Sequence, residues 1–388
     1  MFTKGVNMQK KVLIVDDSAL MRRVLSDIIN SDPRFHVSKV AVNGLEAFML
    51  LTQHKEVYDA VILDINMPQM SGIELLEQLE QKNIKATIII VSTLAKEGAK
   101  ETIRALELGA FDFVTKPESF FEVKSDKFKN KIVACLEVAT KLNGTNIREI
   151  QREDSSLKSN SFYKTATNSN ISVKNESISS SSSAILPKVS SLNRTGRKLI
   201  AIACSTGGPK ALQQVIPKLS AALGCSVLIV QHMPEGFTAS LANRLNEISN
   251  IRVKEAEHLE SLSENTAYIA KGGYQMRLTR ADLNKEVLTV TQEPAKNGLK
   301  PCADYMYESI ADSAYTDIIC VVLTGMGSDG TYGIKKLKEK KNVYVIAQDE
   351  ATSTVYGMPK VVRDNGLVNE VVPLEKIADA IQKSLGVQ

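Results

Sequence analysis

The stretch IAIACSTGGPK, residues 200–210, runs from an apolar segment through a serine and two glycines toward a helical pattern. Such an exit from a strand fits a tight turn, a phosphate-binding loop or a nucleophile held at the end of a sheet. A P-loop requires GxxxxGK followed by Ser or Thr, and a dinucleotide-binding loop requires GxGxxG. Neither pattern is present, which disfavours phosphate binding, but the stretch by itself does not separate a turn, a phosphate-binding loop and a nucleophile.

Apolar runs alternate with helical patterns on both sides of this stretch. Continuous apolar strands separated by helices are typical of a parallel sheet covered on both faces. In the second half, the close spacing of runs between 266 and 292 also predicts a β-hairpin insert in a doubly wound α/β domain. The runs in that half are KLIAIAC (198–204), SVLIVQH (226–232), TAYIAKG (266–272), EVLTVTQ (286–292), IICVVLTG (318–325) and VYVIAQD (343–349).

The first half shows the same alternation and predicts a doubly wound, five-stranded parallel sheet. Its runs are KVLIVDD (11–17), VSKVAV (37–42), DAVILDI (59–65), ATIIIVST (86–93) and DFVTKP (112–117). In the helical pattern after the first run, the spacing predicts that Leu20, Val24 and Ile28 share one buried face.

Residues 144–196 differ from both halves because they are rich in Ser, Asn and Thr, with consecutive serines at 179–183. Such a segment buries too little apolar surface to offset its ordering entropy. We therefore expect a flexible linker at 144–196 between domains at 10–143 and 197–388. Residues 1–9 are expected to be a short N-terminal extension, with Met8 an alternative start.

Composition narrows the partners and the location. The 388 residues include 48 basic and 44 acidic side chains, a net charge of +4 that is too small to indicate a nucleic-acid partner. No apolar run reaches the length of a membrane span, and the start lacks a secretory signal, so we expect no membrane insertion and a cytoplasmic location. The 5 cysteines show no CxxC spacing, which favours reduced thiols.

Polar residues follow the predicted strands of the first half. Asp16 and Asp17 follow the first strand, Asp64 the third, Ser92 the fourth and Lys116 the fifth. These strand ends meet at one edge of a parallel sheet, where ligands bind. Converging carboxylates predict a Mg²⁺ site, and the metal would allow Asp64 to attack a phosphoryl group whose oxygens Ser92 and Lys116 hold.

The second half places a base and an acid at matching strand ends. His232 ends the run at 226–232, and Asp329 lies in the Gly-rich loop after the run at 318–325, so both would share a sheet edge with Ser205. This combination predicts a Ser-His-Asp triad. The other histidines lie in the first half or in a hydrophilic segment: His36, His54 and His258.

Cys204, the neighbour of Ser205, is the alternative nucleophile. It ends an apolar run, and strand side chains alternate, so we expect it to point into the core. We expect the start of the following helix and the second Gly-rich loop to supply oxyanion donors. The candidate oxyanion and active-site loop residues are Thr206, Gly207, Met326 and Gly327.

The motifs VLIVDDS, LDINMP, VST and VTKP resemble receiver domains of two-component response regulators, over residues 10 to about 125. The resemblance implies that Asp64 is the phospho-acceptor and that Ser92 and Lys116 are switch residues. It also implies a Mg²⁺ site formed by Asp16, Asp17, Asp64 and the carbonyl of Asn66. Phe113 occupies the aromatic switch position and lacks the hydroxyl of tyrosine.

The motifs CSTGGP, VQHMP, LTGMGSDG and QDEATSTVYGMP closely resemble the catalytic domain of the CheB family of chemotaxis methylesterases. The resemblance implies that a triad of Ser205, His232 and Asp329 hydrolyses γ-glutamyl methyl esters on methyl-accepting chemoreceptors without a cofactor. It further implies deamidation of receptor glutamines and a chemotaxis histidine kinase as phosphodonor. Where the family reads Arg-Pro-Ser-Val-Asp, this chain has Lys300 for Arg and Cys302-Ala303 for Ser-Val.

Two other functions fit parts of the pattern. A non-catalytic adaptor would bind receptors without hydrolysis, and the intact triad argues against it. A DNA-binding response regulator would need a recognition helix, and the mixed α/β pattern of the second half shows no such signature.

Overall fold

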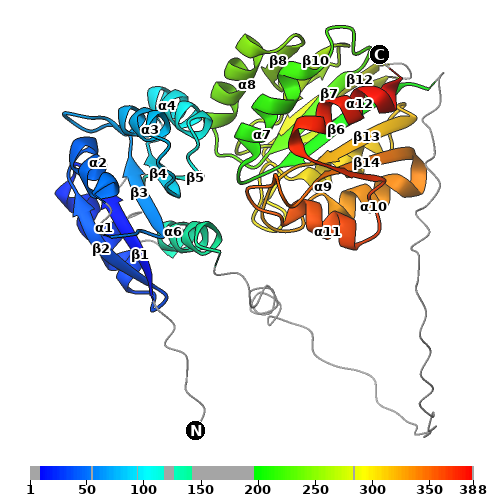
Figure 1. Ribbon diagram of the computed structural model, residues 1–388. Coiled ribbons are helices and arrows are strands. Elements are labelled where there is room, and N and C mark those ends of the chain that lie inside the picture. Colours follow the sequence, from blue (N-terminus) through cyan, green and yellow to red (C-terminus); the bar gives the residue numbers. More distant parts are fainter. Residues whose placement is uncertain are drawn as a thin grey trace, which may run out of the picture.

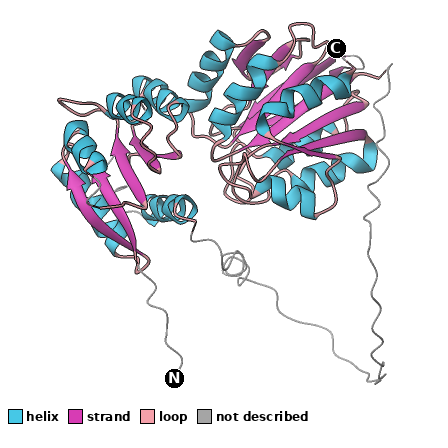
Figure 2. Cartoon of the chain, viewed as in Figure 1, coloured by secondary structure: helices cyan, strands magenta, loops and turns pink. Residues whose placement is uncertain are grey.

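The computed structural model describes residues 9–53, 56–93, 95–117, 126–141, 196–282 and 285–386. Figures 1 and 2 show two α/β bodies, each with a sheet flanked by helices. We call residues 9–141 the N-terminal unit and 196–386 the C-terminal unit. The predicted extension up to residue 8, the linker from 144 to 195 and His54 lie outside the described residues. Within the described part, no helix is both long and apolar enough to cross a membrane.

The N-terminal unit contains the predicted five-stranded parallel sheet, in the order β2-β1-β3-β4-β5. Strands β3 and β4 are buried along their whole length, which explains their continuous apolar sequences. The strands are β1 (Lys10–Val15), β2 (Phe35–Ala41), β3 (Ala60–Asp64), β4 (Ile88–Ser92) and β5 (Asp112–Thr115). The helices are α1 (Ala19–Asn30), α2 (Gly44–Thr52), α3 (Gly72–Gln81), α4 (Lys96–Glu107) and α6 (Asp126–Ala139).

The predicted face of α1 is wrong at one end. Ile28 is buried and Val24 partly buried, but Leu20 is 56% exposed, and the buried face continues instead through Leu25 and Ile29. Each step of four residues overshoots a 3.6-residue turn by about 40°. Three residues spaced by four therefore drift around the helix, and the first leaves the core-facing side.

The C-terminal unit is built on a seven-stranded sheet in the order β15-β14-β13-β6-β7-β10-β8, with every pairing parallel. Its central strand β6 has β7 on one side and β13 on the other, a topological switch point where ligands bind in open α/β sheets. The strands are β6 (Lys198–Cys204), β7 (Ser226–Gln231), β8 (Arg252–Glu255), β10 (Thr266–Ile269), β13 (Asp317–Val322), β14 (Asn342–Gln348) and β15 (Glu370–Val372). The helices are α7 (Gly208–Val215), η2 (Ile216–Lys218), α8 (Phe237–Ile248), α9 (Ala303–Ile310), α10 (Thr331–Lys340), α11 (Met358–Asp364), η3 (Leu374–Lys376) and α12 (Ile377–Leu385).

The predicted hairpin insert is present as a separate antiparallel sheet, β11-β12-β9. It consists of β9 (Glu260–Ser261), β11 (Gln275–Asp282) and β12 (Lys285–Thr291). The apolar run at 266–272 belongs instead to the main sheet, as β10. Sequence periodicity did not predict β8, β9, β11 or β15, because these strands are short or carry exposed polar residues.

The two units contact each other through α4, which lies against α7 and α8. The carboxylate of Glu107 on α4 accepts a hydrogen bond of 2.5 Å from Arg244 Nε on α8. On β5, the ring of Phe113 stacks on Phe237 with a centroid separation of 4.6 Å. The contact brings β5 beside the loop that contains Ser205.

Candidate functional site

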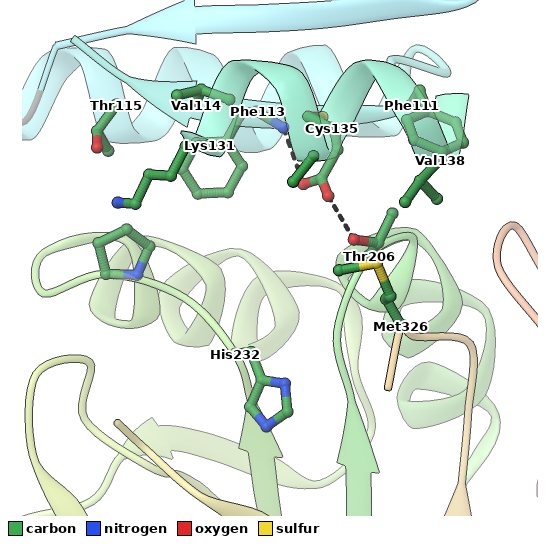
Figure 3. Close-up of a pocket in the computed structure, with 13 residues that line it drawn as sticks. Phe111, Phe113, Val114, Thr115, Lys131, Cys135, Val138, Thr206, His232 and Met326 are labelled. Carbon is green, nitrogen blue, oxygen red and sulfur yellow. Dashed lines mark hydrogen bonds between the residues drawn. The ribbon is translucent and has the colours of Figure 1, made fainter. Parts of the chain in front are cut away.

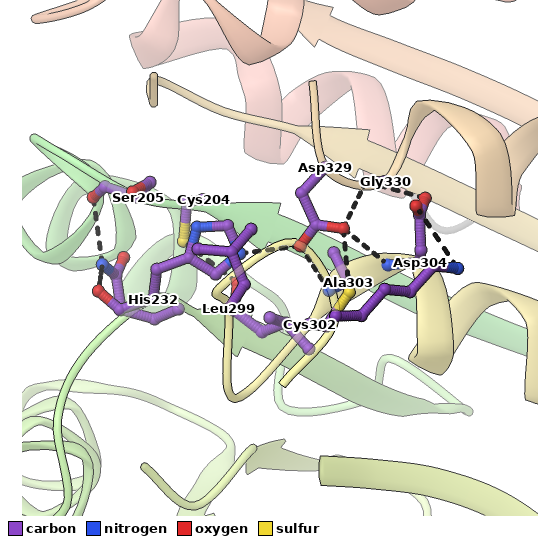
Figure 4. Close-up of polar contacts among 12 residues, drawn as sticks. Cys204, Ser205, His232, Leu299, Cys302, Ala303, Asp304, Asp329 and Gly330 are labelled. Carbon is purple, nitrogen blue, oxygen red and sulfur yellow. Dashed lines mark hydrogen bonds and ion pairs between the residues drawn. The ribbon is translucent and has the colours of Figure 1, made fainter. Parts of the chain in front are cut away.

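The three residues of the predicted triad lie at the carboxyl edge of neighbouring strands. Ser205 follows β6, His232 follows β7, and Asp329 lies in the loop between β13 and α10. Backbone hydrogen bonds join the three exits, because Ser205 N donates to Thr324 O at 3.0 Å and His232 N donates to Cys204 O at 3.1 Å. Figure 4 shows His232 between Ser205 and Asp329.

Asp329 is buried and accepts hydrogen bonds on both carboxylate oxygens. Burial would raise its pKa, but the interaction with His232 and two backbone N–H donors outweigh burial and lower the pKa to about 2. The carboxylate therefore stays ionised at neutral pH. The donors to Oδ2 are His232 Nε2 (2.8 Å) and Ala303 N (2.6 Å), and those to Oδ1 are Asp304 N (3.0 Å), Gly330 N (3.0 Å) and Cys302 Sγ (3.1 Å).

The imidazole of His232 faces Asp329 with Nε2, so Nδ1 is the ring nitrogen left to accept a proton from Ser205. Among the described residues, no hydrogen bond joins Ser205 Oγ to His232. Catalytic hydrogen bonds are often loose before substrate binds, so this geometry is compatible with a triad. The structure thus pairs His232 with Asp329, and the Ser205 hydroxyl makes no hydrogen bond within the described ranges.

Gln231 is a site residue that our sequence reasoning missed. Its Nε2 donates to the carbonyls of Ser205 (3.0 Å) and His232 (3.3 Å), and the side chain is buried. It therefore fixes the backbone of the nucleophile relative to that of the base. The available signal was its place in VQHMP, directly before His232.

The turn after Ser205 requires its glycines. Gly207 has a φ of +78°, in the left-handed region, and begins α7 as its N-cap. A Cβ on Gly325 would lie 2.8 Å from the Cβ of Ser205. Cys204 is fully buried, and burial raises the pKa of its thiol, which confirms the expectation that it belongs to the core.

The N-terminal unit covers this site. A cavity of about 250 Å³ lies between the two units, with Thr206, His232 and Met326 on one side and β5 and α6 on the other (Figure 3). The hydroxyl of Thr206 donates to the Asp112 carboxylate at 2.5 Å. Burial raises the pKa of Asp112, partly offset by this hydrogen bond.

The acidic residues of the N-terminal unit converge as predicted. Ligand oxygens of Asp16, Asp17 and Asp64 lie within 4.8 Å of one another. Lys116 Nζ lies 3.0 Å from Asp16 Oδ2 and 2.6 Å from Asp64 Oδ2. Burial raises the pKa of Asp64, although Lys116 acts to lower it. For Lys116, the interactions with the Asp64 and Asp16 carboxylates outweigh burial and raise the pKa. Carboxylate oxygens in this arrangement suit a hard divalent cation.

The remaining predicted switch residues lie around this cluster. The Ser92 hydroxyl is buried and donates to Gly98 O at 3.2 Å, so it points toward α4 and not toward Asp64. Asn66 is exposed, two residues after the end of β3. Phe113 is partly buried and turned to the C-terminal unit, where it meets Phe237.

The fold and these two sites define a receiver unit joined to an α/β unit with the residues of a serine hydrolase. A family model described as CheB methylesterase matches residues 200–381, and one described as response regulator receiver domain matches residues 12–125. The chain belongs to the CheB family of receiver-regulated methylesterase/glutaminases of chemotaxis adaptation. The fold class and the function predicted from the sequence are thereby confirmed.

Full-length relatives agree with this assignment. The chain is 39% identical to a protein-glutamate methylesterase/protein-glutamine glutaminase of Pyrococcus horikoshii, over 97% of this chain and 93% of that protein. It is 38% identical to the protein of the same name from Bacillus subtilis, over 96% of this chain and 97% of that protein. Among solved structures, the CheB methylesterase catalytic domain of Thermotoga maritima is 37% identical, with 50% of this chain and 99% of that chain covered and a TM-score of 0.46.

Proposed function

We propose that the C-terminal unit hydrolyses glutamate γ-methyl esters on methyl-accepting chemoreceptors through Ser205, His232 and Asp329, and deamidates receptor glutamines at the same site. The observation that carries this proposal is the 2.8 Å hydrogen bond between His232 and Asp329 at the strand edge that holds Ser205. In the proposed domain arrangement, a receiver at 10–143 and a catalytic domain at 197–388 are joined by a linker at 144–196.

The proposed reaction proceeds through an acyl-enzyme. Ser205 Oγ attacks the ester carbonyl while His232 Nδ1 takes its proton, and His232 then returns the proton to the leaving methanol. Water, activated by His232, attacks the acyl group and releases the glutamate carboxylate and free Ser205. From a glutamine side chain, ammonia leaves in place of methanol. The hydrolysis needs no cofactor.

Backbone N–H groups around Ser205 would stabilise the oxyanion. Among the described residues, the N–H groups of Thr206, Met326 and Gly327 make no other hydrogen bond, and Gly207 begins α7, whose N-terminus favours negative charge. Thr206 and Met326 line the same cavity as His232. One such donor typically contributes about 10²–10³ in rate.

In the receiver, Asp16, Asp17, Asp64 and the main-chain carbonyl of Asn66 would hold Mg²⁺. When bound, the ion screens the negative charge that Asp64 meets as it accepts a phosphoryl group. The phosphodonor would be a chemotaxis histidine kinase. Lys116 would hold the new phosphoryl oxygens, and Ser92 would leave Gly98 O to join it.

Phosphorylation would act on the covered active site. Movement of Ser92 and of the face bearing Phe113 would weaken the stacking on Phe237 and open the cavity above His232. We propose a cytoplasmic location for this signalling step. It is supported by five cysteines that are all free in the structure, as expected in a reducing compartment.

Methanol release from methylated chemoreceptor membranes tests this function. We expect release to rise when a small phosphodonor and Mg²⁺ are added together. Asp64→Asn removes the phosphoryl acceptor, so its release should remain at the unstimulated level under all conditions. A full response to the phosphodonor in the Asp64→Asn variant would contradict the proposed regulation.

Arg244→Ala tests whether docking of the receiver restrains the enzyme. The Arg244 guanidinium is partly exposed, and ion pairs of this kind contribute up to about 1 kcal/mol, so we expect unphosphorylated methanol release to rise up to about fivefold. Lys254→Ala is the matched control, because the ion pairs of Lys254 in the described part of the chain are with residues of its own unit, Glu257 and Glu260.

The double variant Glu107→Ala with Arg244→Ala should release methanol no faster than the more active of the two single variants, since both substitutions remove the same ion pair. Equal activation by Lys254→Ala, or no activation by Arg244→Ala, would exclude this contact as a restraint.

A further inference from the structure

Cys302 is the one side chain other than His232 that donates to the Asp329 carboxylate in the described residues. Its Sγ lies 3.1 Å from Asp329 Oδ1, and the residue is only 1% exposed. Figure 4 shows the thiol below this carboxylate, on the side away from Ser205. The acyl-enzyme reaction of Ser205, His232 and Asp329 does not itself use this thiol.

We propose that Cys302 is a positioning residue for hydrolysis, whose thiol donates a hydrogen bond to Asp329 and so fixes the carboxylate that orients His232. The inference rests on the proposed function, because the positioning matters only if His232 acts as the base. It assigns to Cys302 no contact with substrate and no covalent step.

The backbone around Cys302 is held so that the thiol faces Asp329. Cys302 N donates to Gln275 Oε1 at 2.9 Å, and Gln275 Nε2 donates to Leu299 O at 3.1 Å. Gln275 is fully buried on β11, so the antiparallel sheet anchors the segment that carries the thiol. Cys302 is also the N-cap of α9, where the backbone N–H of Tyr305 approaches its sulfur. That contact uses the sulfur as an acceptor, so the S–H hydrogen can still be donated to the carboxylate.

The chemistry of the cluster favours a neutral thiol donor. Burial, followed by the charge of Asp329, raises the pKa of Cys302 to about 12, so the proton stays on sulfur at neutral pH. Cys302, Asp304 and Asp329 also lie close enough to hold a cation. However, Asp304 Oδ1 accepts from Gly330 N at 3.0 Å and Gly333 N at 2.7 Å, and Asp329 accepts three backbone N–H groups. These oxygens are arranged for hydrogen-bond donors.

A serine side chain, like the thiol of Cys302, ends in one hydrogen that can be donated. The inference therefore predicts that the donor, and not the sulfur, is what the site requires.

Cys302→Ala and Cys302→Ser in the full-length chain test the inference by methanol release from methylated chemoreceptor membranes. We expect Cys302→Ala to lower kcat/KM about tenfold, the range of one hydrogen bond to a charged group, and Cys302→Ser to stay within about twofold of wild type. Cys320→Ala is the matched control, because Cys320 is fully buried on β13 and its thiol makes no hydrogen bond to the triad among the described residues. It should lose stability without the loss in kcat/KM.

The pH profile of kcat/KM supplies a readout that packing alone would not change. Without the hydrogen bond from the thiol, the Asp329 carboxylate stabilises the protonated imidazole of His232 more strongly. The acidic limb of the profile should therefore move to higher pH in Cys302→Ala, and stay at its wild-type position in Cys302→Ser. These substitutions leave the other charged groups around His232 and Asp329 in place. The groups are Asp112 and Lys131 across the cavity, Asp304, and Lys296 beside Asp304.

Two results would overturn the inference. One is a wild-type kcat/KM in Cys302→Ala together with an inactive Ser205→Ala. The inactive serine variant would then support the proposed function, while the active Cys302→Ala would exclude the role of the thiol. The other is an equal loss in the alanine and serine variants with an unmoved acidic limb, which would assign Cys302 to packing only. If the alanine variant does not fold, the serine variant still decides, because a folded Cys302→Ser with a tenfold loss contradicts the donor role.

Discussion

Ser205→Ala is expected to lower kcat for methanol release by about 10⁵-fold or more, the range seen when a hydrolase loses its nucleophile. The hydroxyl lies at the carboxyl edge of β6, one residue beyond the buried strand, and makes no hydrogen bond among the described residues. Its removal takes away the atom that forms the acyl-enzyme and leaves the fold untouched. Release of methanol and the melting temperature should be measured together, because only the first should change.

The adjacent thiol provides the control for Ser205. Cys204 is fully buried in the same strand, and its thiol faces Val230 O at 3.8 Å. Cys204→Ala should therefore keep kcat within a few-fold of wild type while it lowers stability through the cavity it leaves. If Cys204→Ala abolishes methanol release and Ser205→Ala does not, the nucleophile has been assigned to the wrong residue.

The placement of the triad follows from properties that a sequence displays directly. The segments before Ser205, His232 and Asp329 are apolar runs long enough for buried strands, and they form the adjacent parallel strands β6, β7 and β13. Parallel strands bring their carboxyl ends to one edge, so polar residues after such runs converge. The acidic cluster around Asp64 was predictable for the same reason.

Other parts of the site depend on contacts that local sequence does not encode. Three of the donors to Asp329 come from the segment at 302–304, whose conformation depends on Gln275 in a different sheet. Glu107 and Arg244 lie on amphipathic helices, where a charged residue that faces solvent looks the same as one that faces another domain. The drift of the buried face in α1 likewise appears only when the helix meets its sheet, which leaves Leu20 exposed.

Asp329→Asn is expected to lower kcat by about 10⁴-fold, through the wrong tautomer of His232. The asparagine NH₂ group must replace one of two oxygens that both accept backbone N–H groups. At the Oδ1 position it would face two of them, Asp304 N and Gly330 N, and at the Oδ2 position only Ala303 N. The second orientation is therefore favoured, and it turns an N–H toward His232 Nε2. The ring must then accept at Nε2 and carry its proton on Nδ1, where it cannot take the proton of Ser205.

The same substitution should lower stability in a pH-dependent way. The pKa of Asp329 is about 2 in the fold against an ordinary value of 3.8, so the ionised carboxylate stabilises the native state by about 2 kcal/mol above pH 3.8. That contribution is lost as the pH falls through 2, and the asparagine variant lacks it at every pH. Urea unfolding at pH 7 should therefore show the variant less stable than wild type, with a gap that narrows in strong acid. Unchanged kcat in a folded Asp329→Asn would show that His232 acts as the base without this carboxylate.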